Sequence, residues 1–498
     1  MRARKTSSLL VALFVASLPS ACAVNPVTGR PELTTMSPAR EAAVGREAAE
    51  QVQSEMGLVD DPSLQAYVDR VGQRLAAFSP RKDTPYDFHV VELEEPNAFA
   101  LPGGHVYVSR GLLALVNSED ELANVMGHEV GHVAARHAAQ RETRSTGVGI
   151  LSALGTIAAG ILAGGEAAQA VGQLSQVAGG GLIASYSRDQ EREADAIGQQ
   201  IASAAGYDPA AMASFLDTLE RWTRLESGGP RRPGFLDSHP ATPERVAATA
   251  SRAETLHAGP AAPVAPTRVA FLGELEGLRV GPNVEEGVVE ETLFLHPGMD
   301  LSLRFPAGWR VENQRHAVVA GAPEGDALLG VELLGPGTDA RAAASAFVQR
   351  NGLRPAQAAS FRTAEADGFY VAAPVATEGG QVAGWIGFVP HGGQIFRVTG
   401  LASLQTWRSR FPRFQSTAES LGPLSREERA RLRDRRLRVA TAQGGDTLGT
   451  LSSREGNVWR LQETAVANAL SPDVRLVAGQ PVKIVVAHAL PAASEPAR

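Results

Sequence analysis

The residues whose types and spacing most clearly indicate catalytic chemistry lie between Val125 and His132, a stretch that contains the pattern HExxH. His128 and His132 are four positions apart, so on an α-helix they share a face and their rings can converge on one ion. Neutral imidazole suits Zn²⁺, and a catalytic zinc needs three protein ligands plus one open position for water. Glu129 is placed to take a proton from that water. The motif therefore predicts a zinc site that activates water.

A helix has to carry this motif, and the sequence before it contains a start signal. Ser118 and Glu121 form the capping-box pattern Ser-x-x-Glu. The apolar positions that follow are Leu122, Val125, Met126, Val130 and Val133. HExxH alone is a weak signal, because its histidines can simply be solvated or packed in a core. The helical context favours the metal site.

The third ligand has to come from another segment, and the stretch from Ser187 to Asp195 offers one. Glu191 and Asp195 share a helical face, so Glu191 can reach the metal while Asp195 accepts a hydrogen bond from a ligating histidine. Glu193 is a rival ligand, but it points about 200° away from Glu191 on a helical wheel. The alternative is that these charged residues only form surface ion pairs.

Several separated motifs resemble one protease family. The HExxH helix, the later ExxxD helix and the stretch from Asn97 to Gly104 are similar to the HtpX/Oma/CAAX-prenyl-protease group of gluzincins, peptidase family M48. The segment from Asn25 to Arg30 resembles its periplasmic branch. The resemblance covers residues 23–255 and implies a mainly α-helical zinc endopeptidase domain with a small β-sheet. Its expected zinc ligands are His128, His132 and Glu191, with Glu129 as the general base and Asp195 behind a ligand.

The resemblance also assigns a role to a strand. In this family the strand corresponding to Asn97, Ala98, Phe99 and Ala100 borders the active-site cleft. An extended substrate can add to such an edge through main-chain hydrogen bonds. A tight turn built on Pro102 and the following glycines is compatible with that role.

The segment from Ser238 to Arg245 resembles the family element HPxxxxR. His239 could approach the zinc, either displacing the water in a resting form or stabilising the oxyanion. Arg245 would then line the cleft. The alternative is a helix-capping loop with Pro243 in the first turn.

The first 22 residues read as a secretory signal, with a basic start and an apolar core from Leu9 to Leu18. Cys22 is the only cysteine and resembles the lipidated first residue of a bacterial lipoprotein, although Pro19 departs from the usual aliphatic residue. An ordinary cleaved signal is the alternative. A sole cysteine leaves no intrachain disulfide. We expect a periplasmic protein anchored to the outer membrane.

Composition indicates a globular chain of several domains: 498 residues, 44% hydrophobic and 20% charged. A net charge of −7 argues against a general nucleic-acid binder. Residues Gly147 to Gly164 are apolar and long enough for a short membrane span. They are mostly Gly and Ala without aromatic or basic anchors, so a helical hairpin over the active-site region is favoured. An integral-membrane protease like HtpX is the alternative.

The second half of the chain divides by composition. A Pro/Ala-rich linker occupies 257–289, and an α+β domain follows at 290–422, expected to dock or present substrates. Its clearest strands are Leu301–Phe305, Gly384–Val389 and Ile395–Val398, with a turn at His391 to Gly393 and helices at Ala340–Asn351 and Thr406–Ser420.

A basic helical connector is expected at 423–438, and residues 439–487 resemble a LysM module. The matching segments are Gly445-Asp446-Thr447-Leu448, Asn468-Ala469-Leu470 and Leu476 to Ile484. LysM modules bind N-acetylglucosamine glycans, so the resemblance implies peptidoglycan as a partner. Residues 488–498 are expected to be a disordered tail.

Taken together, a signal at 1–22 and a zinc protease domain at 23–256 predict an endopeptidase of the bacterial cell envelope. Misfolded or misassembled envelope proteins are the expected substrates, with one Zn²⁺ per chain. The competing hypothesis is a non-catalytic, peptidoglycan-anchored chaperone or assembly factor.

Overall fold

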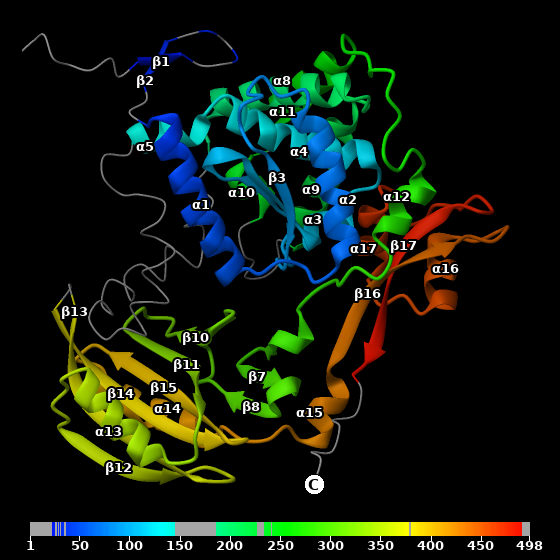
Figure 1. The fold of residues 1–498 in the computed structure, drawn as a ribbon. Helices are drawn as coiled ribbons and strands as arrows, with labels where there is room; N and C mark the ends of the chain where they lie inside the picture. Colours follow the sequence, from blue (N-terminus) through cyan, green and yellow to red (C-terminus); the bar gives the residue numbers. More distant parts are fainter. Residues whose placement is uncertain are drawn as a thin grey trace, which may run out of the picture.

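The computed structural model describes residues 36–144, 186–226, 234–240, 242–377 and 380–490, with 22–24, 27, 29 and 31–33. The predictions for the signal segment, the Cys22 side chain, Gly147–Gly164 and residues 491–498 lie outside the described residues. Within the described ranges no helix combines the length and the apolar character needed to cross a membrane. Figure 1 shows a helical part, a sheet-rich part below it and, at the right, a pair of strands formed by residues 433–441 and 481–489.

The helical part comes first in the chain, and side-chain caps mark the starts of its first two helices. Ser37 caps the first helix by accepting a hydrogen bond from the Arg40 N–H, and Asp61 caps the second, each followed by proline. The helices are α1 (Pro38–Glu55), α2 (Pro62–Ala76), α3 (Arg110–Leu115), α4 (Glu119–Ala134), α5 (His137–Arg144), α8 (Arg188–Ala204), α9 (Ala211–Glu226), α10 (Phe235–Ser238) and α11 (Pro243–Ala253). Helix α4 lies at the centre, packed against α2, α8 and α9.

A three-stranded sheet lies against α4. Strands β3 (Asp87–Val91) and β5 (His105–Ser109) are parallel and belong to the small β-sheet that the family resemblance implies. Strand β4 (Ala98–Ala100) pairs antiparallel with β5 and forms the edge of the sheet. The short β1 (Cys22–Val24) and β2 (Pro31–Leu33) pair separately.

The stretch predicted as a linker, residues 257–289, makes packing contacts with the helical part. Glu119, the first residue of α4, accepts hydrogen bonds from the Val264 N–H at 2.6 Å and from the Tyr67 hydroxyl at 2.8 Å. Helix α12 (Arg268–Glu274) then buries Phe271 in the core that surrounds α4. Apolar burial of α12 offsets the chain entropy that a Pro/Ala-rich segment would otherwise retain.

The sheet-rich part confirms the α+β character expected for residues 290–422. Its seven antiparallel strands run in the order β12-β13-β14-β15-β11-β10-β9, beside a small sheet of β6, β7 and β8. Helices α13 and α14 pack against separate clusters of alternating strand residues, and therefore against opposite faces. The bounds are β6 (Val288–Glu290), β7 (Leu293–His296), β8 (Leu301–Arg304), β9 (Arg310–Asn313), β10 (Ala317–Gly321), β11 (Ala327–Pro336), α13 (Ala340–Arg350), β12 (Gln357–Arg362), β13 (Asp367–Thr377), β14 (Gly380–His391), β15 (Gln394–Ala402) and α14 (Trp407–Glu419).

The hairpin between β14 and β15 turns where the sequence predicts. Gly392 and Gly393 both have positive φ, 57° and 75°, between the paired residues His391 and Gln394. Two successive positive φ angles match the twist of the flanking strands, and glycine adopts them without a steric penalty.

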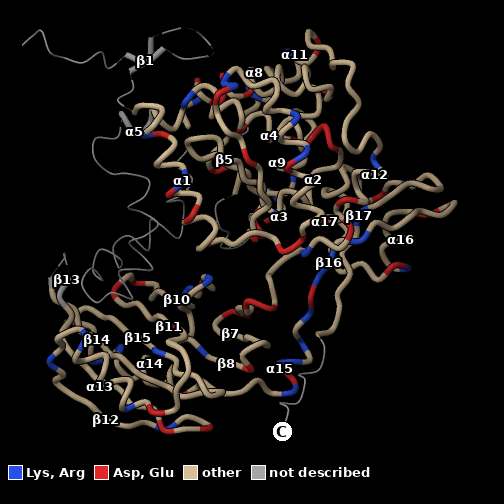
Figure 2. The backbone as a smooth tube through the Cα atoms, in the orientation of Figure 1, with Lys and Arg blue, Asp and Glu red and all other residues tan. Residues whose placement is uncertain are grey.

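A βααβ unit closes the chain. Its elements are β16 (Arg433–Thr441), α16 (Leu448–Glu455), α17 (Leu461–Ala467) and β17 (Pro481–Ala489), with β16 antiparallel to β17. The prediction of a helical connector up to residue 438 is only partly right, because α15 (Arg426–Arg431) is short and β16 begins at Arg433. Figure 2 marks basic positions in blue along the backbone of β16. Pairing with β17 overrides the helix propensity of arginine, which is among the higher ones.

Lys483 fixes this unit to the helical part. Its side chain is fully buried, and Nζ donates to the carbonyl oxygens of Ala114 at 2.8 Å and Val116 at 2.7 Å. These carbonyls lie at the end of α3, where backbone oxygens lack a partner within the helix and need another donor. Trp459 also meets Trp222 of α9 edge to face. The βααβ unit is therefore docked and does not form an independent appendage.

We predict that Lys483→Ala destabilises the folded chain. It removes two hydrogen bonds and leaves two carbonyls unpaired, so the free energy of unfolding should fall by about 1–3 kcal/mol in urea titrations. Lys82→Ala is the control, because Lys82 also donates to a helix-end carbonyl, that of Ala77, but at an exposed position. An Lys483→Ala loss no larger than that of the control would contradict the docking role.

Candidate metal centre

Helix α4 presents the HExxH residues from a buried position. Ser118 caps the helix by accepting the Glu121 N–H at 3.2 Å, as predicted. The return bond of a capping box is absent from this pair, because the Glu121 carboxylate accepts the Asn117 N–H at 2.7 Å instead. His128, Glu129 and His132 lie two turns further on and are almost inaccessible to solvent.

Glycines let α8 approach α4 closely. A Cβ on Gly127 would lie 2.9 Å from the Gly198 carbonyl oxygen, and a Cβ on Gly131 would lie 2.8 Å from that of Ala194. Either contact is shorter than real Cβ atoms tolerate. The small residues recur every four positions on both helices, so they form matching strips. This close approach brings Glu191 of α8 beside the histidines of α4.

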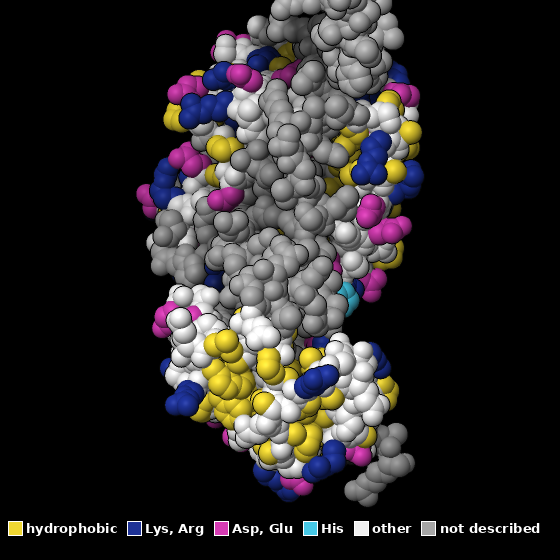
Figure 3. All heavy atoms as spheres, turned by 90° about the vertical axis from the view of Figure 1, so that its left-hand side faces the viewer, with side chains coloured by type: hydrophobic (Ala, Val, Ile, Leu, Met, Phe, Trp, Pro, Cys, Tyr) yellow, Lys and Arg dark blue, Asp and Glu magenta, His cyan; other side chains and the backbone are white. Residues whose placement is uncertain are grey.

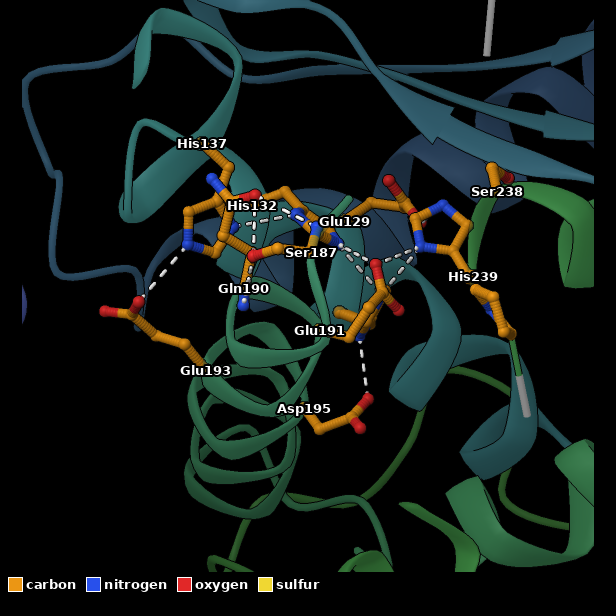
Figure 4. A network of polar contacts seen from close by, with 12 residues as sticks. Glu129, His132, His137, Ser187, Gln190, Glu191, Glu193, Asp195, Ser238 and His239 are labelled. Carbon is orange, nitrogen blue, oxygen red and sulfur yellow. Dashed lines mark hydrogen bonds and ion pairs between the residues drawn. The ribbon is translucent and has the colours of Figure 1, made fainter. Parts of the chain in front are cut away.

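Four side chains converge at this contact. His128, His132, Glu191 and His239 each offer one ligand atom, and these atoms lie within 4.8 Å of one another. The Nε2 atoms of His128 and His132 are 3.0 Å apart, and Glu191 Oε1 lies 3.4 Å from His132 Nε2. Figure 4 shows Glu191 and His239 pointing toward each other beside Glu129. Three imidazoles and a carboxylate form a donor set suited to zinc.

The charge of the site also fits a divalent cation. Glu129, Glu191 and Asp195 are three buried carboxylates, and Arg245 is the one buried guanidinium that contacts Glu191 and Asp195 among the described residues. This leaves two negative charges that burial makes costly. Both oxygens of Glu129 are buried and have no hydrogen-bond partner among the described residues. A dication with an adjacent water would neutralise the site and give the Glu129 carboxylate a partner.

The pKa shifts follow from this crowding. Burial raises the pKa of Glu129. Burial would raise that of Glu191 as well, but His239 and the hydrogen bonds from His132 and His239 hold the Glu191 pKa well below its usual range. Burial lowers the pKa of His132, which keeps the neutral imidazole that a metal requires.

Asp195 and Arg245 lie directly behind the ligands. Asp195 Oδ1 is 2.9 Å from His128 Nδ1, so this carboxylate can fix the His128 tautomer. Arg245 contacts Asp195 and Glu191 at 2.7 Å each. Arg245 is 4% exposed and bridges these two carboxylates.

Helix α10 and the edge strand position His239. The His239 ring stacks on Phe235 with centroids 4.5 Å apart, and its Nε2 lies 3.5 Å from Glu129 Oε1. The Phe235 N–H donates to the Pro96 carbonyl at 2.9 Å. This bond ties α10 to the segment that leads into β4. The residues Asn97 to Ala100 therefore lie near the metal-ligand cluster, at the sheet edge that the sequence assigned to them.

Sequence reasoning missed part of the site. Glu193 lies outside the ligand cluster. Its carboxylate is 3.3 Å from His137 Nε2. His137 in turn contacts His132, on which the Tyr186 ring stacks with centroids 3.9 Å apart. No spacing rule marks His137, because it reaches His132 through the turn at Arg136, where φ is +57°.

Comparison with known proteins places the helical part in context. The family model described as "Peptidase family M48" matches residues 62–253. The chain is 32% identical to the metalloprotease YcaL of Escherichia coli K12 over 36% of this chain and 68% of that protein. It is 33% identical to the beta-barrel assembly-enhancing protease of the same organism, over 45% of this chain and 46% of that protein. Identity to the mitochondrial metalloendopeptidase OMA1 of Schizosaccharomyces pombe is 32%, over 44% of this chain and 63% of that one.

The matches fall short of the whole chain. The chain spans about half the length of the beta-barrel assembly-enhancing proteases that it matches. The matched family region, residues 62–253, contains all four residues of the ligand cluster.

Proposed function

The chain belongs to peptidase family M48, and from this premise we propose that it is a zinc-dependent endopeptidase. The observation that carries the proposal is the convergence of His128, His132 and Glu191 beside the Glu129 carboxylate, which accepts no hydrogen bond from the described residues. A Zn²⁺ held by these three ligands would act as a Lewis acid on the scissile carbonyl and would acidify water. Metal ligands and a base in one buried site are what hydrolysis of a peptide bond requires.

Glu129 performs the proton transfers in this proposal. It accepts a proton from the attacking water and gives it to the nitrogen of the departing amine. A general base works best with a pKa near the working pH, and burial moves the pKa of Glu129 upward in that direction. Arg245 holds Glu191 and Asp195 still while the proton moves.

The substrate main chain is proposed to add to β4. Among the described strands, β4 pairs only with β5, and it lies against the helix that carries the motif. An extended peptide can pair with the open edge formed by Asn97, Ala98, Phe99 and Ala100. Main-chain pairing depends little on side chains, which suits a protease that acts on many unfolded sequences.

His239 has two candidate roles. As a fourth ligand it would fill the position that water needs, and its Nδ1 lies 3.2 Å from His128 Nε2 and 2.9 Å from Glu191 Oε1. As an oxyanion stabiliser it would donate a hydrogen bond to the developing negative charge. Its place within the ligand cluster supports the first role, a brake on the resting enzyme.

We place the enzyme in the bacterial cell envelope, acting on misfolded or misassembled envelope proteins. Support comes from the similarity to proteins named beta-barrel assembly-enhancing protease. Lipidation at Cys22 and anchoring to the outer membrane remain part of this proposal. Figure 3 shows hydrophobic side chains gathered on one face of the sheet-rich part, which supports a role of residues 290–422 in holding unfolded substrates.

A glycan-binding role for the βααβ unit is a second proposal. The observation that favours it is the LysM-like order of β16, α16, α17 and β17. The loops before α16 and after α17 meet through the Leu476 N–H, which donates to the Asp446 carbonyl at 2.8 Å. Gly444 and Pro472 are exposed on these two loops, so the loops can reach peptidoglycan while the unit stays docked.

We predict that Glu129→Gln binds zinc but does not cleave. Removing the general base should lower the rate of casein hydrolysis by about 10²–10⁴-fold while zinc content stays at one per chain. Glu220→Gln on the exposed surface of α9 is the control. Near-wild-type cleavage by Glu129→Gln would reject the mechanism. A wild-type protein that binds zinc without any cleavage would favour the non-catalytic assembly factor.

We predict that His239→Ala raises basal proteolysis of an unfolded substrate while zinc content is kept. Removing a fourth ligand reopens the position for water. The rival role predicts the opposite sign, because removing one oxyanion donor costs about 10²–10³ in rate. Unchanged activity would reject both roles and leave His239 as a residue of the capping loop.

We predict that the full-length protein co-sediments with purified peptidoglycan through the two loops. The double substitution Gly444→Glu and Pro472→Glu should abolish sedimentation, because carboxylates would crowd a neutral glycan. A Cβ on Gly444 meets no atom within 4 Å, so the substitution should not strain the fold. Ser453→Glu with Gln462→Glu adds the same charge at exposed helix positions and is the control. Equal sedimentation of both double variants would contradict binding at these loops.

A further inference from the structure

The two motif histidines have different partners on their second ring nitrogen. His128 Nδ1 faces the carboxylate of Asp195 directly, at 2.9 Å. His132 Nδ1 lies 2.8 Å from another imidazole nitrogen, Nδ1 of His137. The other nitrogen of His137, Nε2, lies 3.3 Å from Glu193 Oε2. Figure 4 shows His137 between His132 and Glu193.

The positions of the protons in this chain follow from the donor inventory. His132 Nε2 faces the ligand cluster, so a metal there requires the proton of His132 on Nδ1. That N–H donates to His137, whose Nδ1 must then be an acceptor. A neutral imidazole carries a single N–H, which for His137 is on Nε2 and points at the Glu193 carboxylate.

We propose that His137 and Glu193 are positioning residues for the metal ligand His132. Glu193 orients the His137 ring, and His137 fixes the tautomer and orientation of His132 through a neutral imidazole. This inference rests on the proposed metal centre. It also accounts for Glu193, a carboxylate on the opposite side of α8 from Glu191 that takes no part in the ligand cluster.

The backbone around His137 supports a dedicated position. Arg136 links α4 to α5 and has φ of +57°, a conformation that costs free energy in any residue other than glycine. Its guanidinium is held by the Glu41 carboxylate at 2.9 Å and by the Met36 carbonyl at 2.7 Å. The turn at Arg136 redirects the chain so that the fully buried His137 returns toward His132.

The contacts from Glu193 through His137 to His132 form a relay, and burial strengthens its hydrogen bond between the two imidazoles. The His132 and His137 side chains are almost entirely buried, whereas Glu193 is 25% exposed and remains partly solvated. A hydrogen bond in a dry environment gains electrostatic strength, and a chain of such bonds polarises each member. The relay therefore raises the basicity of His132 without placing a fourth carboxylate against the site, which already holds three.

The zinc dissociation constant, measured by competition with a chromophoric chelator, tests the relay. Loss of a partner behind a ligand typically weakens metal binding about 10–100-fold, so we expect this for His137→Leu. His137→Asn keeps an acceptor oxygen near the place of Nδ1 and should bind zinc within about threefold of wild type. Glu193→Gln should fall between the two variants. Asp189→Asn, at an exposed position of the same helix, is the control and should bind as wild type does.

Thermal unfolding of the metal-free variants separates a fold defect from a ligand defect. If His137→Leu does not fold, Glu193→Gln decides, because its side chain is partly exposed and the change keeps its shape. Wild-type zinc affinity in all three variants, Glu193→Gln, His137→Asn and His137→Leu, would overturn the relay. Equal losses in His137→Asn and His137→Leu would overturn the assigned direction of the hydrogen bond. A wild-type protein with no zinc affinity would instead reject the metal centre itself.

Discussion

The site depends on the close contact between glycines of α4 and the backbone of α8. Gly127 and Gly131 of α4 face Gly198 and Ala194 of α8 so closely that a Cβ on Gly127, Gly131 or Gly198 would meet the other helix at under 3.0 Å. Small facing residues let two helix axes approach, as ridges cannot form there. At this separation the short carboxylate side chain of Glu191 can reach both imidazole rings of α4. A larger residue in the strip would move Glu191 away before any ligand changed.

The close approach concentrates charge, and the surrounding elements compensate for it in layers. Arg245 from α11 bridges Glu191 and Asp195, although it leaves the site two charges short of neutrality. A divalent cation supplies that difference, so metal binding and folding of the two helices should be coupled. Outside the ligands, Glu41 receives both Arg81 and Arg136 and so fixes the turn that carries His137. The chemistry of the site and the packing of α1, α4, α8 and α11 are therefore one network.

The sequence predicts the local parts of this network well. Caps at Ser37, Asp61 and Ser187 mark helix starts because a side-chain acceptor close to the first turn is a local requirement. The ligand motif is equally local, since four-residue spacing on a helix places His128 with His132. The strands of the sheet-rich part follow from β-branched and aromatic runs.

Long-range packing is what the sequence does not reveal. The Pro/Ala-rich segment near Val264 looks like a linker. In the folded chain, however, the Val264 N–H donates to Glu119, which is distant in sequence and close in space. The arginines from Arg433 onward look helical until β17 pairs with them. His137 carries no recognisable spacing for a ligand, and its role depends on the turn at Arg136. In each case the deciding partner is more than a helical turn away along the chain or is set by an unusual backbone angle.

The most direct test of this account is the position of the metal in crystals of the protein. Anomalous scattering measured on both sides of the zinc edge should give one peak per chain, within about 2.0–2.2 Å of the ligating atoms of His128, His132 and Glu191. A peak at another group of side chains, or full zinc content with no peak in this cluster, would contradict the account.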